Sequence, residues 1–403
     1  MEWQDLPVQA LFALEKLEQA GFEAALVGGC VRDRLMGRTP GDYDIATSAL
    51  PEETLRVFAG ERTVPTGLQH GTVMLVYEGM PMEITTFRED GEYTDMRRPD
   101  SVRFTRSLKE DVRRRDFTMN ALAWEREKGV IDHTGGAEDI NNGLIRAVGV
   151  PERRFSEDAL RILRAVRFSA QLGFKVEKET EQAAFALQEN IGRIAAERVR
   201  AEMEKTLRGR FAAQMIGKYR DILRPRLLCA GEIGNEQWAL AAERLGKLPC
   251  ADAALSWAAL LAVVGAQRAQ ETLQALRMDK ATAQSACRCI ALADDALDTL
   301  HALRCAAGDM GMDCARNAVR LKFAFDAGKR QEMLALLGRI ESEKLPCTAA
   351  EMDIGGADLM ETGLRGREVG RMMALLLDDV RAGRIPNRRE ALLARAGEIS
   401  AKG

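Results

Sequence analysis

The spacing of apolar positions changes character several times along the first 125 residues. Apolar residues at helical spacing alternate with short apolar runs that end at glycine or polar residues. Pro51 and the acidic residues after it are typical of a helix N-terminus. We predict helices over 7–20, 30–37 and 51–58, strands over 23–29 and 41–47, and a hairpin of strands over 71–79 and 81–87. This part of the chain is predicted to be a mixed α/β domain.

The pattern is different in the rest of the chain. The polar segment Arg88–Val102 has no periodicity and is predicted to be a loop, and 132–143 is predicted to be a turn-rich hinge. After Pro151 the pattern is helical, with helices expected over 156–172, 177–189 and 193–208 and then Ala/Leu-rich helices to the end. The predicted fold class is therefore α+β, with an α/β head on a long helical body.

The length of the chain bears on how it divides into domains. A chain of 403 residues is too long for one ordinary hydrophobic core, so we expect several domains. The expected division is a catalytic head over 1–150, a helical neck over 151–210, a helical body over 211–300 and a helical tail over 301–403.

Composition narrows the protein class. The chain is 46% hydrophobic and 30% charged, as in soluble globular proteins. The N-terminus lacks the basic and apolar regions of a signal peptide, and the longest apolar run, Leu255–Ala266, is too short to cross a membrane. Eight cysteines without regular spacing suggest reduced thiols in a cytosol. Cys287 and Cys289 form C-x-C, and with only three histidines a zinc site is not expected.

The net charge of −3 does not indicate nucleic-acid binding, but the distribution of charge is uneven. Residues 97–126 carry nine basic and five acidic residues, and residues 146–175 carry seven basic and three acidic residues. These segments could bind phosphates, although a solvated helix face is the more common explanation of such charge.

Two carboxylates stand out in the stretch LVGGCVRDRLMGRTPGDYDIATSA. Asp42 and Asp44 are two residues apart on a predicted strand, so both side chains point to the same face. A divalent ion such as Mg²⁺ relieves their repulsion, and a pair of such ions can activate a hydroxyl and stabilise a leaving pyrophosphate. Glu83 could supply a third carboxylate from a neighbouring strand. Taken alone, an Asp-x-Asp pair is usually just a pair of surface acids.

A glycine pair precedes these carboxylates. Gly28 and Gly29 lie between a predicted strand and a helix, where bare backbone N–H groups form an anion site, and Arg32 follows one turn later. The segment matches neither a P-loop nor G-x-G-x-x-G. A phosphate site close to a metal site suits nucleotidyl transfer, whereas the glycines alone would be an ordinary turn.

The motifs together resemble the class II tRNA nucleotidyltransferases, the bacterial CCA-adding enzymes. The resemblance implies a polymerase-β-type nucleotidyltransferase head followed by an all-α neck, body and tail. It is strong over about 200 residues and extends through most of the chain. The segments that carry it are GGCVRD, GDYDIATSA, EITTFREDGEYTDMRRP, DVRRRDFTMNALA, DHTGG, RFSEDALRILRAVRF, ERVRAEMEKTL and GADLMETGLRGREVGRMMALLLDDVRAGRIPN.

Asp158 and Arg161 are candidates for choosing the base. They are three residues apart, on one face of a predicted helix, where an exposed ion pair is the plain alternative. Cytosine and adenine each show an amine donor beside a ring-nitrogen acceptor, whereas uracil and guanine show a carbonyl beside a ring N–H. A carboxylate and a guanidinium match the first pattern and oppose the second. The resemblance implies the same role, as a template made of amino acids.

The resemblance assigns roles to further residues. It implies that Arg164 and Arg167 contact the incoming nucleotide, that Arg115 binds nucleotide, and that Asp116 with Asn120 holds the ribose. The charges of Glu197–Glu202 are expected to act as struts between helices. The loop with Arg97, Arg98 and Pro99 resembles the one that accompanies the switch from CTP to ATP, which favours complete CCA addition.

The expected function is cytoplasmic, template-independent addition of CCA to new or damaged tRNA 3′ ends, from CTP and ATP, with release of pyrophosphate. Mg²⁺ is the expected cofactor, and the helical body is expected to bind the acceptor and TΨC arms. No membrane association is expected, no protein partner is indicated, and a homodimer is left open. The alternatives are a poly(A) polymerase or A-adding enzyme of the same superfamily, and a non-catalytic RNA-binding protein.

Overall fold

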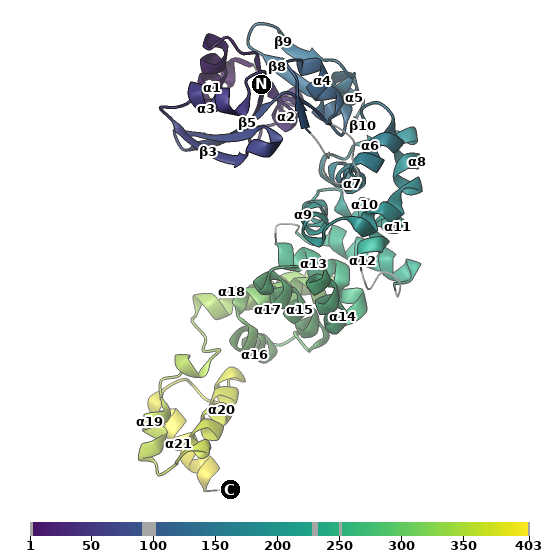
Figure 1. The fold of residues 1–403 in the computed structure, drawn as a ribbon. Helices are drawn as coiled ribbons and strands as arrows, with labels where there is room; N and C mark the ends of the chain where they lie inside the picture. The colour runs from purple at the N-terminus through teal and green to yellow at the C-terminus, as the bar shows by residue number, and fades with distance from the viewer. Residues whose placement is uncertain (1–2, 91–101, 228–232, 250–251, 402–403) are drawn as a thin grey trace. The chain divides into compact units, whose positions relative to one another are not determined.

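The computed structural model describes residues 3–90, 102–227, 233–249 and 252–401 (Figure 1). The chain forms two compact units. The first unit comprises Met1–Phe211 with Lys218–Arg226, and the second comprises Ala212–Gly217 with Leu227–Gly403. Because this two-unit division does not test the expected boundaries of head, neck, body and tail, these boundaries stay a prediction.

A seven-stranded mixed sheet forms the frame of the first unit. Its strand order is β3-β4-β5-β2-β1-β8-β9, and all neighbours are antiparallel except β2 and β5. The strands are β1 (Ala24–Val27), β2 (Asp44–Thr47), β3 (Arg62–Gly67), β4 (Thr72–Tyr77), β5 (Met80–Thr86), β8 (Leu122–Glu125) and β9 (Gly129–Asp132). Two small pairs accompany the sheet: β6 (Arg88–Asp90) with β7 (Val102–Phe104), and β10 (Leu144–Ile145) with β11 (Lys175–Val176).

Helices of the first unit pack on the sheet. Strand β1, which lies inside the sheet between β2 and β8, is buried along its whole length. Leu108 and Val112 of α4 pack against alternate residues of β1 and β2, among them Val27 and Ala46. Asp44 alternates with Ile45 and so shares the face of Ala46. The helices are α1 (Val8–Gln19), α2 (Gly29–Leu35), α3 (Pro51–Val57), α4 (Leu108–Arg113) and α5 (Gly136–Asn141).

The predicted mixed α/β pattern is confirmed, with several corrections. Strands β3, β8 and β9 and helix α4 were not predicted. Strand β3 contains Pro65 and lies at the edge of the sheet, where a missing N–H is tolerated. The predicted loop Arg88–Val102 begins and ends in strands, and its residues 91–101, including Arg97, Arg98 and Pro99, lie outside the described residues. The predicted hinge contains α5, because the Asp132 carboxylate accepts four backbone N–H groups, from Thr134 to Ala137, and starts that helix.

Short helices follow the sheet in the first unit. The predicted helix over 156–172 is wrong at its start: α6 ends at Glu157, Asp158 is extended (φ −145°, ψ 103°), and α7 begins at Leu160. The Asp158 carboxylate accepts the Leu160 N–H at 3.1 Å and so competes with a continuous helix. The helices are α6 (Pro151–Glu157), α7 (Leu160–Leu172), α8 (Lys178–Ala186), α9 (Ala196–Leu207) and α11 (Arg220–Leu223), with α10 (Ala212–Lys218) at the boundary of the units.

The second unit consists of helices in its described part. In α13, eight of nine residues are buried, and α15 packs against α13, α14 and α17. A separate apolar cluster joins the last three helices around Leu359, Leu376 and Leu392. None of the helices described has the length and apolar character needed to span a membrane. The helices are α12 (Asn235–Lys247), α13 (Ala253–Leu261), α14 (Gly265–Ala275), α15 (Lys280–Asp294), α16 (Leu300–Met310), α17 (Met312–Lys322), α18 (Ala327–Ser342), α19 (Gly356–Glu361), α20 (Arg367–Arg381) and α21 (Arg389–Ser400). The fold is α+β, as predicted.

Candidate active site

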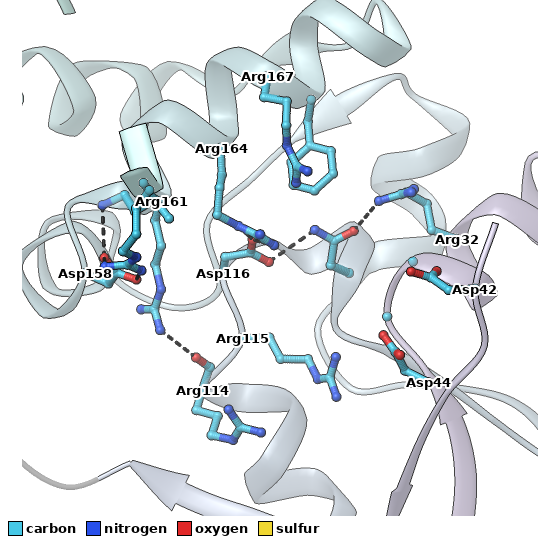
Figure 2. A pocket seen from close by; sticks show the side chains of 16 residues that line it. Arg32, Asp42, Asp44, Arg114, Arg115, Asp116, Asp158, Arg161, Arg164 and Arg167 are labelled. Atoms are coloured by element: carbon cyan, nitrogen blue, oxygen red, sulfur yellow. Dashed lines mark hydrogen bonds and ion pairs between the residues drawn. The ribbon is translucent and has the colours of Figure 1, made fainter. Parts of the chain in front are cut away.

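A polar cavity of about 490 Å³ opens in the first unit, where the sheet meets α7 and α9 (Figure 2). Side chains from β2, from the segment after α4 and from α7 point into it. Every predicted site residue lines this cavity except Glu83. The lining residues are Gly28, Gly29, Arg32, Asp42, Asp44, Arg114, Arg115, Asp116, Asn120, Asp158, Leu160, Arg161, Arg164, Arg167, Phe168 and Arg198.

Asp42 and Asp44 lie at one side of the cavity (Figure 2). Only Asp44 belongs to β2, and Asp42 precedes the strand, so the predicted strand that held both aspartates is wrong at its start. The pKa of Asp44 is raised to about 6. Burial is the main cause, and the negative charges of Asp42 and Glu83 add to it. Ile45 pairs with Ile84 across the parallel strands β2 and β5, so Asp44 and Glu83 lie level on the same face of the sheet. Glu83 is exposed and does not line the cavity. This group of oxygen ligands with mutually unfavourable charge fits a divalent cation.

Gly28 has a backbone conformation and a close neighbour that favour glycine at this position. Its φ of +75° and ψ of −126° are strained for residues with a side chain. A Cβ at Gly28 would lie 3.0 Å from Nη1 of Arg115, whereas a Cβ at Gly29 would meet only Arg32, at 3.7 Å. The missing side chain therefore leaves room for the guanidinium of Arg115 beside α2.

A chain of hydrogen bonds links four residues that line the cavity. Arg164 donates to Asp116 at 2.7 Å, Asn120 donates to the other oxygen of Asp116 at 3.2 Å, and Arg32 donates to Asn120 at 2.7 Å (Figure 2). Burial alone would raise the pKa of Asp116, but Arg164 and Asn120 outweigh it and hold the pKa at about 2. The predicted grouping of Asp116 with Asn120 is thus a direct contact.

Phe168, which the sequence analysis did not single out, supports three arginines. Its ring centroid lies 4.0 Å from the guanidinium carbon of Arg167, 5.2 Å from that of Arg32 and 5.4 Å from that of Arg164. Phe168 and Arg164 are four residues apart on α7, so helical spacing was the available signal. Arg167 also forms an ion pair with Glu202 of α9 at 2.9 Å, a strut of the kind expected for this segment.

Asp158 and Arg161 line the cavity but do not share a helix face, which corrects the prediction. Arg161 belongs to α7 and donates to Glu157 at 2.7 Å and to the carbonyl oxygen of Arg114 at 3.1 Å. Asp158 precedes α7, and Arg198 of α9 donates to both of its carboxylate oxygens, at 2.7 and 3.3 Å. The two side chains thus approach the cavity from different local structures.

Asp111 is a second residue that the sequence analysis missed. Its side chain is 1% exposed, and it accepts hydrogen bonds from Arg114 at 2.7 Å and Arg115 at 3.2 Å. Arg115 and Arg114 also lower its pKa against the effect of burial. Spacing of three and four residues from Asp111 to the two arginines was the signal for this contact.

Known families match successive parts of the chain. A "Poly A polymerase head domain" model matches residues 24–146, a "Probable RNA and SrmB- binding site of polymerase A" model matches 173–221, and a model of tRNA nucleotidyltransferase domain 2 matches 249–396. The CCA-adding enzyme of Leuconostoc mesenteroides is 38% identical over 391 residues, covering 94% of this chain and 93% of the relative. This chain belongs to the CCA-adding enzyme family.

Further relatives agree with this membership. The CCA-adding enzyme of Bacillus velezensis is 40% identical over 392 residues, covering 95% of this chain and 96% of the relative. The crystal structure of the Bacillus stearothermophilus CCA-adding enzyme in complex with CTP matches at a TM-score of 0.86 and 35% identity, over 98% of each chain. The predicted family and fold class are confirmed. Membership of a nucleotidyltransferase family implies dependence on a divalent metal ion, which agrees with the acidic group formed by Asp42, Asp44 and Glu83.

Proposed function

We propose that this protein adds C, C and A in turn to the 3′ end of tRNA, without a nucleic-acid template. CTP and ATP are the substrates, pyrophosphate is released, and both immature and damaged 3′ ends are acceptors. The observation that carries the proposal is one cavity that holds an acidic pair, a group of arginines and a carboxylate–guanidinium set able to test a base edge. We expect the enzyme to act in the cytoplasm, where its substrates meet.

Mg²⁺ is the cation that we propose for the acidic pair. Asp42 and Asp44 would hold it, and Glu83 lies on the same sheet face to support the charge. Mg²⁺ favours carboxylate and phosphate oxygens together with water, which suits a site that receives a triphosphate. When bound, one such ion would lower the pKa of the tRNA 3′-hydroxyl, and a second would neutralise charge on the triphosphate.

Arg32 and Arg115 are proposed to position the triphosphate beside the backbone of Gly29. Arg115 is oriented by buried Asp111, and Arg32 by Asn120 and Asp33. Two guanidinium groups fixed in this way can bind phosphate oxygens without first being ordered, which favours a reactive geometry. Arg164 and Arg167, stacked with Phe168, are proposed to complete the nucleotide contacts.

Asp116 and Asn120 are proposed to hold the ribose. The Asp116 carboxylate stays ionised because Arg164 and Asn120 keep its pKa at about 2, so it accepts hydrogen bonds at neutral pH. A 2′-hydroxyl can donate to such an acceptor, whereas a deoxyribose offers no donor there. This contact would favour ribonucleotides.

Asp158 and Arg161 are proposed to select the base. The carboxylate would accept from the exocyclic amine of C or A, and the guanidinium would donate to the adjacent ring nitrogen. Uracil and guanine would face both groups with the wrong polarity and offer them no hydrogen bond, which is costly in a partly buried site. Arg161 is 8% exposed, so a mismatch there could not be relieved fully by water.

The helical second unit is proposed to bind the acceptor and TΨC arms of tRNA. Exposed Arg365, Arg367 and Arg371 at the start of α20 provide positive charge for phosphates. Such contacts carry little sequence information, which suits an enzyme that must accept every tRNA.

The direct test incubates the purified protein with tRNA ending at the discriminator base and with CTP, ATP or both. We expect two additions with CTP alone, three with both nucleotides, and none after Asp42→Ala or Asp44→Ala. Incorporation of ATP but never CTP would favour a poly(A) polymerase or A-adding enzyme. Activity that is unchanged in Asp42→Ala would remove the proposed metal site, and absence of activity in the wild type would favour a non-catalytic RNA-binding protein.

Base selection has its own test. We expect Asp158→Ala to lower kcat/KM for CTP and ATP and to reduce the preference for them over UTP and GTP. Arg153→Ala is the matched control, because Arg153 forms an exposed ion pair with Glu157 near the same site. Unchanged discrimination in Asp158→Ala would contradict the proposed role of Asp158.

A further inference from the structure

Three potential metal ligands converge in the second unit, outside the cavity described above. His301 and Cys305 lie one turn apart on α16, and Asp378 lies on α20. Nε2 of His301 is 2.8 Å from Oδ1 of Asp378, and Sγ of Cys305 is 3.7 Å from the same Nε2. All three ligand atoms lie within 4.8 Å of one another. His301 and Asp378 keep 42% and 49% of their side chains exposed, so an ion can reach them.

The arrangement does not suit nucleophilic catalysis. In a relay of nucleophile, imidazole and carboxylate, the two partners contact opposite nitrogens of the ring. Here Cys305 and Asp378 both approach Nε2 of His301. Three different ligand atoms that meet at one point are instead what a metal site requires.

The two distances from His301 are close to those around a small tetrahedral ion, and the ligand atoms of Cys305 and Asp378 lie within 4.8 Å of each other. Zinc bonds of about 2.0–2.3 Å to nitrogen, oxygen and sulfur separate neighbouring ligand atoms by roughly 3.3–3.7 Å. The Cys305–His301 separation of 3.7 Å already has this value, and the His301–Asp378 contact needs to open by only about half an ångström. One nitrogen, one sulfur and one carboxylate oxygen favour zinc over magnesium or calcium.

Neighbouring contacts hold the two helices in place. Arg304, 5% exposed on α16, donates to the carbonyl oxygens of Val380 at 2.6 Å and Arg381 at 3.0 Å, at the end of α20. Arg384 forms an ion pair with Oδ2 of Asp378, which leaves Oδ1 toward His301. Such supporting contacts orient ligands before an ion binds.

We propose that His301, Cys305 and Asp378 form a Zn²⁺ site, with water as the fourth ligand, that ties α20 to α16. The sequence does not predict a zinc site, because the cysteine pattern is C-x-C and histidines are few. The spacing of His301 and Cys305 fits one helix face, but their third partner comes from a distant helix and has no local signal. Zinc at this site would steady the C-terminal helices and need not take part in nucleotide addition.

Cobalt is the probe that separates this site from the acidic pair in the first unit. The metal-free full-length protein is titrated with Co²⁺ and followed by absorption, then with Zn²⁺ in competition. We expect one Co²⁺ to give intense tetrahedral d–d bands and a sulfur-to-metal charge-transfer band, and Zn²⁺ to displace it. Co²⁺ bound by Asp42 and Asp44 lacks a sulfur ligand, so the charge-transfer band should persist in Asp42→Ala.

Variants assign the ligands. Cys305→Ser and His301→Gln should remove the charge-transfer band or weaken Zn²⁺ binding at least roughly 100-fold. Cys287→Ser is the matched control, because Cys287 is a half-buried thiol on α15 outside the site. Zn²⁺ should raise the Tm of the wild type and Cys287→Ser but not that of Cys305→Ser. A wild type without the charge-transfer band, or a Cys305→Ser variant that keeps it, would overturn the proposal and leave only a His301–Asp378 ion pair.

Discussion

Arg198 binds both carboxylate oxygens of Asp158, at 2.7 and 3.3 Å, and so fixes the orientation of this carboxylate at the cavity. Asp158 has an extended backbone between two helices, where a free side chain would have several rotamers. The pair joins α9 to the start of α7. The proposed base-selecting carboxylate is therefore preorganised by a residue on another helix.

Arg198→Ala should weaken base selection and leave the contacts of the nucleotide's phosphates unchanged. Loss of the ion pair frees the Asp158 side chain, so we expect kcat/KM for CTP to fall by roughly tenfold, equivalent to about 1.4 kcal/mol. Arg200→Ala on the same helix is the control, because Arg200 pairs with Glu204 rather than Asp158. Steady-state kinetics with CTP and UTP measure the effect, and equal behaviour of the two variants would argue against preorganisation by Arg198.

Asp44 should make the metal-free protein less stable as the pH rises. Its pKa of about 6 in the fold exceeds its ordinary value of 3.8, so the folded state binds this proton more tightly than the unfolded chain does. The contribution of Asp44 to the stability of the protein is thus most favourable below pH 4, and it is lost as the pH rises through about 6. Asp44→Asn should stabilise the metal-free protein at neutral pH by at most about 3 kcal/mol while abolishing activity.

Denaturant unfolding with EDTA at acidic and neutral pH tests this expectation. Mg²⁺ should stabilise the wild type at neutral pH but have little effect on Asp44→Asn, because the cation relieves the repulsion that the variant has already removed. A variant less stable than the wild type at neutral pH in EDTA would refute the argument.

Gly28→Ala should strain the turn before α2. The new Cβ would lie 3.0 Å from Arg115, on a backbone with φ of +75°. We expect a loss of about 1–3 kcal/mol in the free energy of unfolding, together with a displaced Arg115. Gly29→Ala is the control for stability, since its Cβ would meet only Arg32, at 3.7 Å. Thermal unfolding compares the two, and equal losses would show that the conformation of Gly28 is not decisive.

Asp116→Asn should destabilise the protein in a pH-dependent way. Arg164 and Asn120 overcome burial and hold the Asp116 pKa at about 2, below its ordinary 3.8, so its stabilising effect is present above pH 4 and lost as the pH falls toward 2. At neutral pH we expect a loss of about 2–3 kcal/mol, because Arg164 keeps a 32% exposed side chain that water can partly solvate. Chemical unfolding should show this difference shrinking between pH 4 and pH 2, and a constant difference would contradict the ion-pair origin.

Much of the head could be predicted from local pattern. The strand with Asp44 and the hairpin β4–β5 follow from apolar runs bounded by glycine, and the turn before α2 follows from Gly28 and Gly29. The nearness of Arg32 to Asp42 and Asp44 in the site could be predicted because these residues are close together in the sequence. Their distant partners, such as Asp158 and Arg161, were placed through the family resemblance rather than through spacing.

The errors and omissions have physical causes. The helix break at Asp158 depends on one side chain that accepts a backbone N–H, which competes with a helical pattern that is otherwise continuous. Strand β3 has few apolar residues and a proline, and only its partner β4 makes it a strand. The pairing of Arg198 with Asp158, and the meeting of His301 with Asp378, depend on how helices pack, which no local spacing records.

A crystal structure with CTP and Mg²⁺ tests the central claim most directly. We expect a metal ion bound by Asp42 and Asp44, and the triphosphate against Arg32 and Arg115. The amine edge of cytosine should face Asp158 and Arg161. A structure in which the two aspartates bind no metal and the cytosine lies away from Asp158 and Arg161 would contradict it.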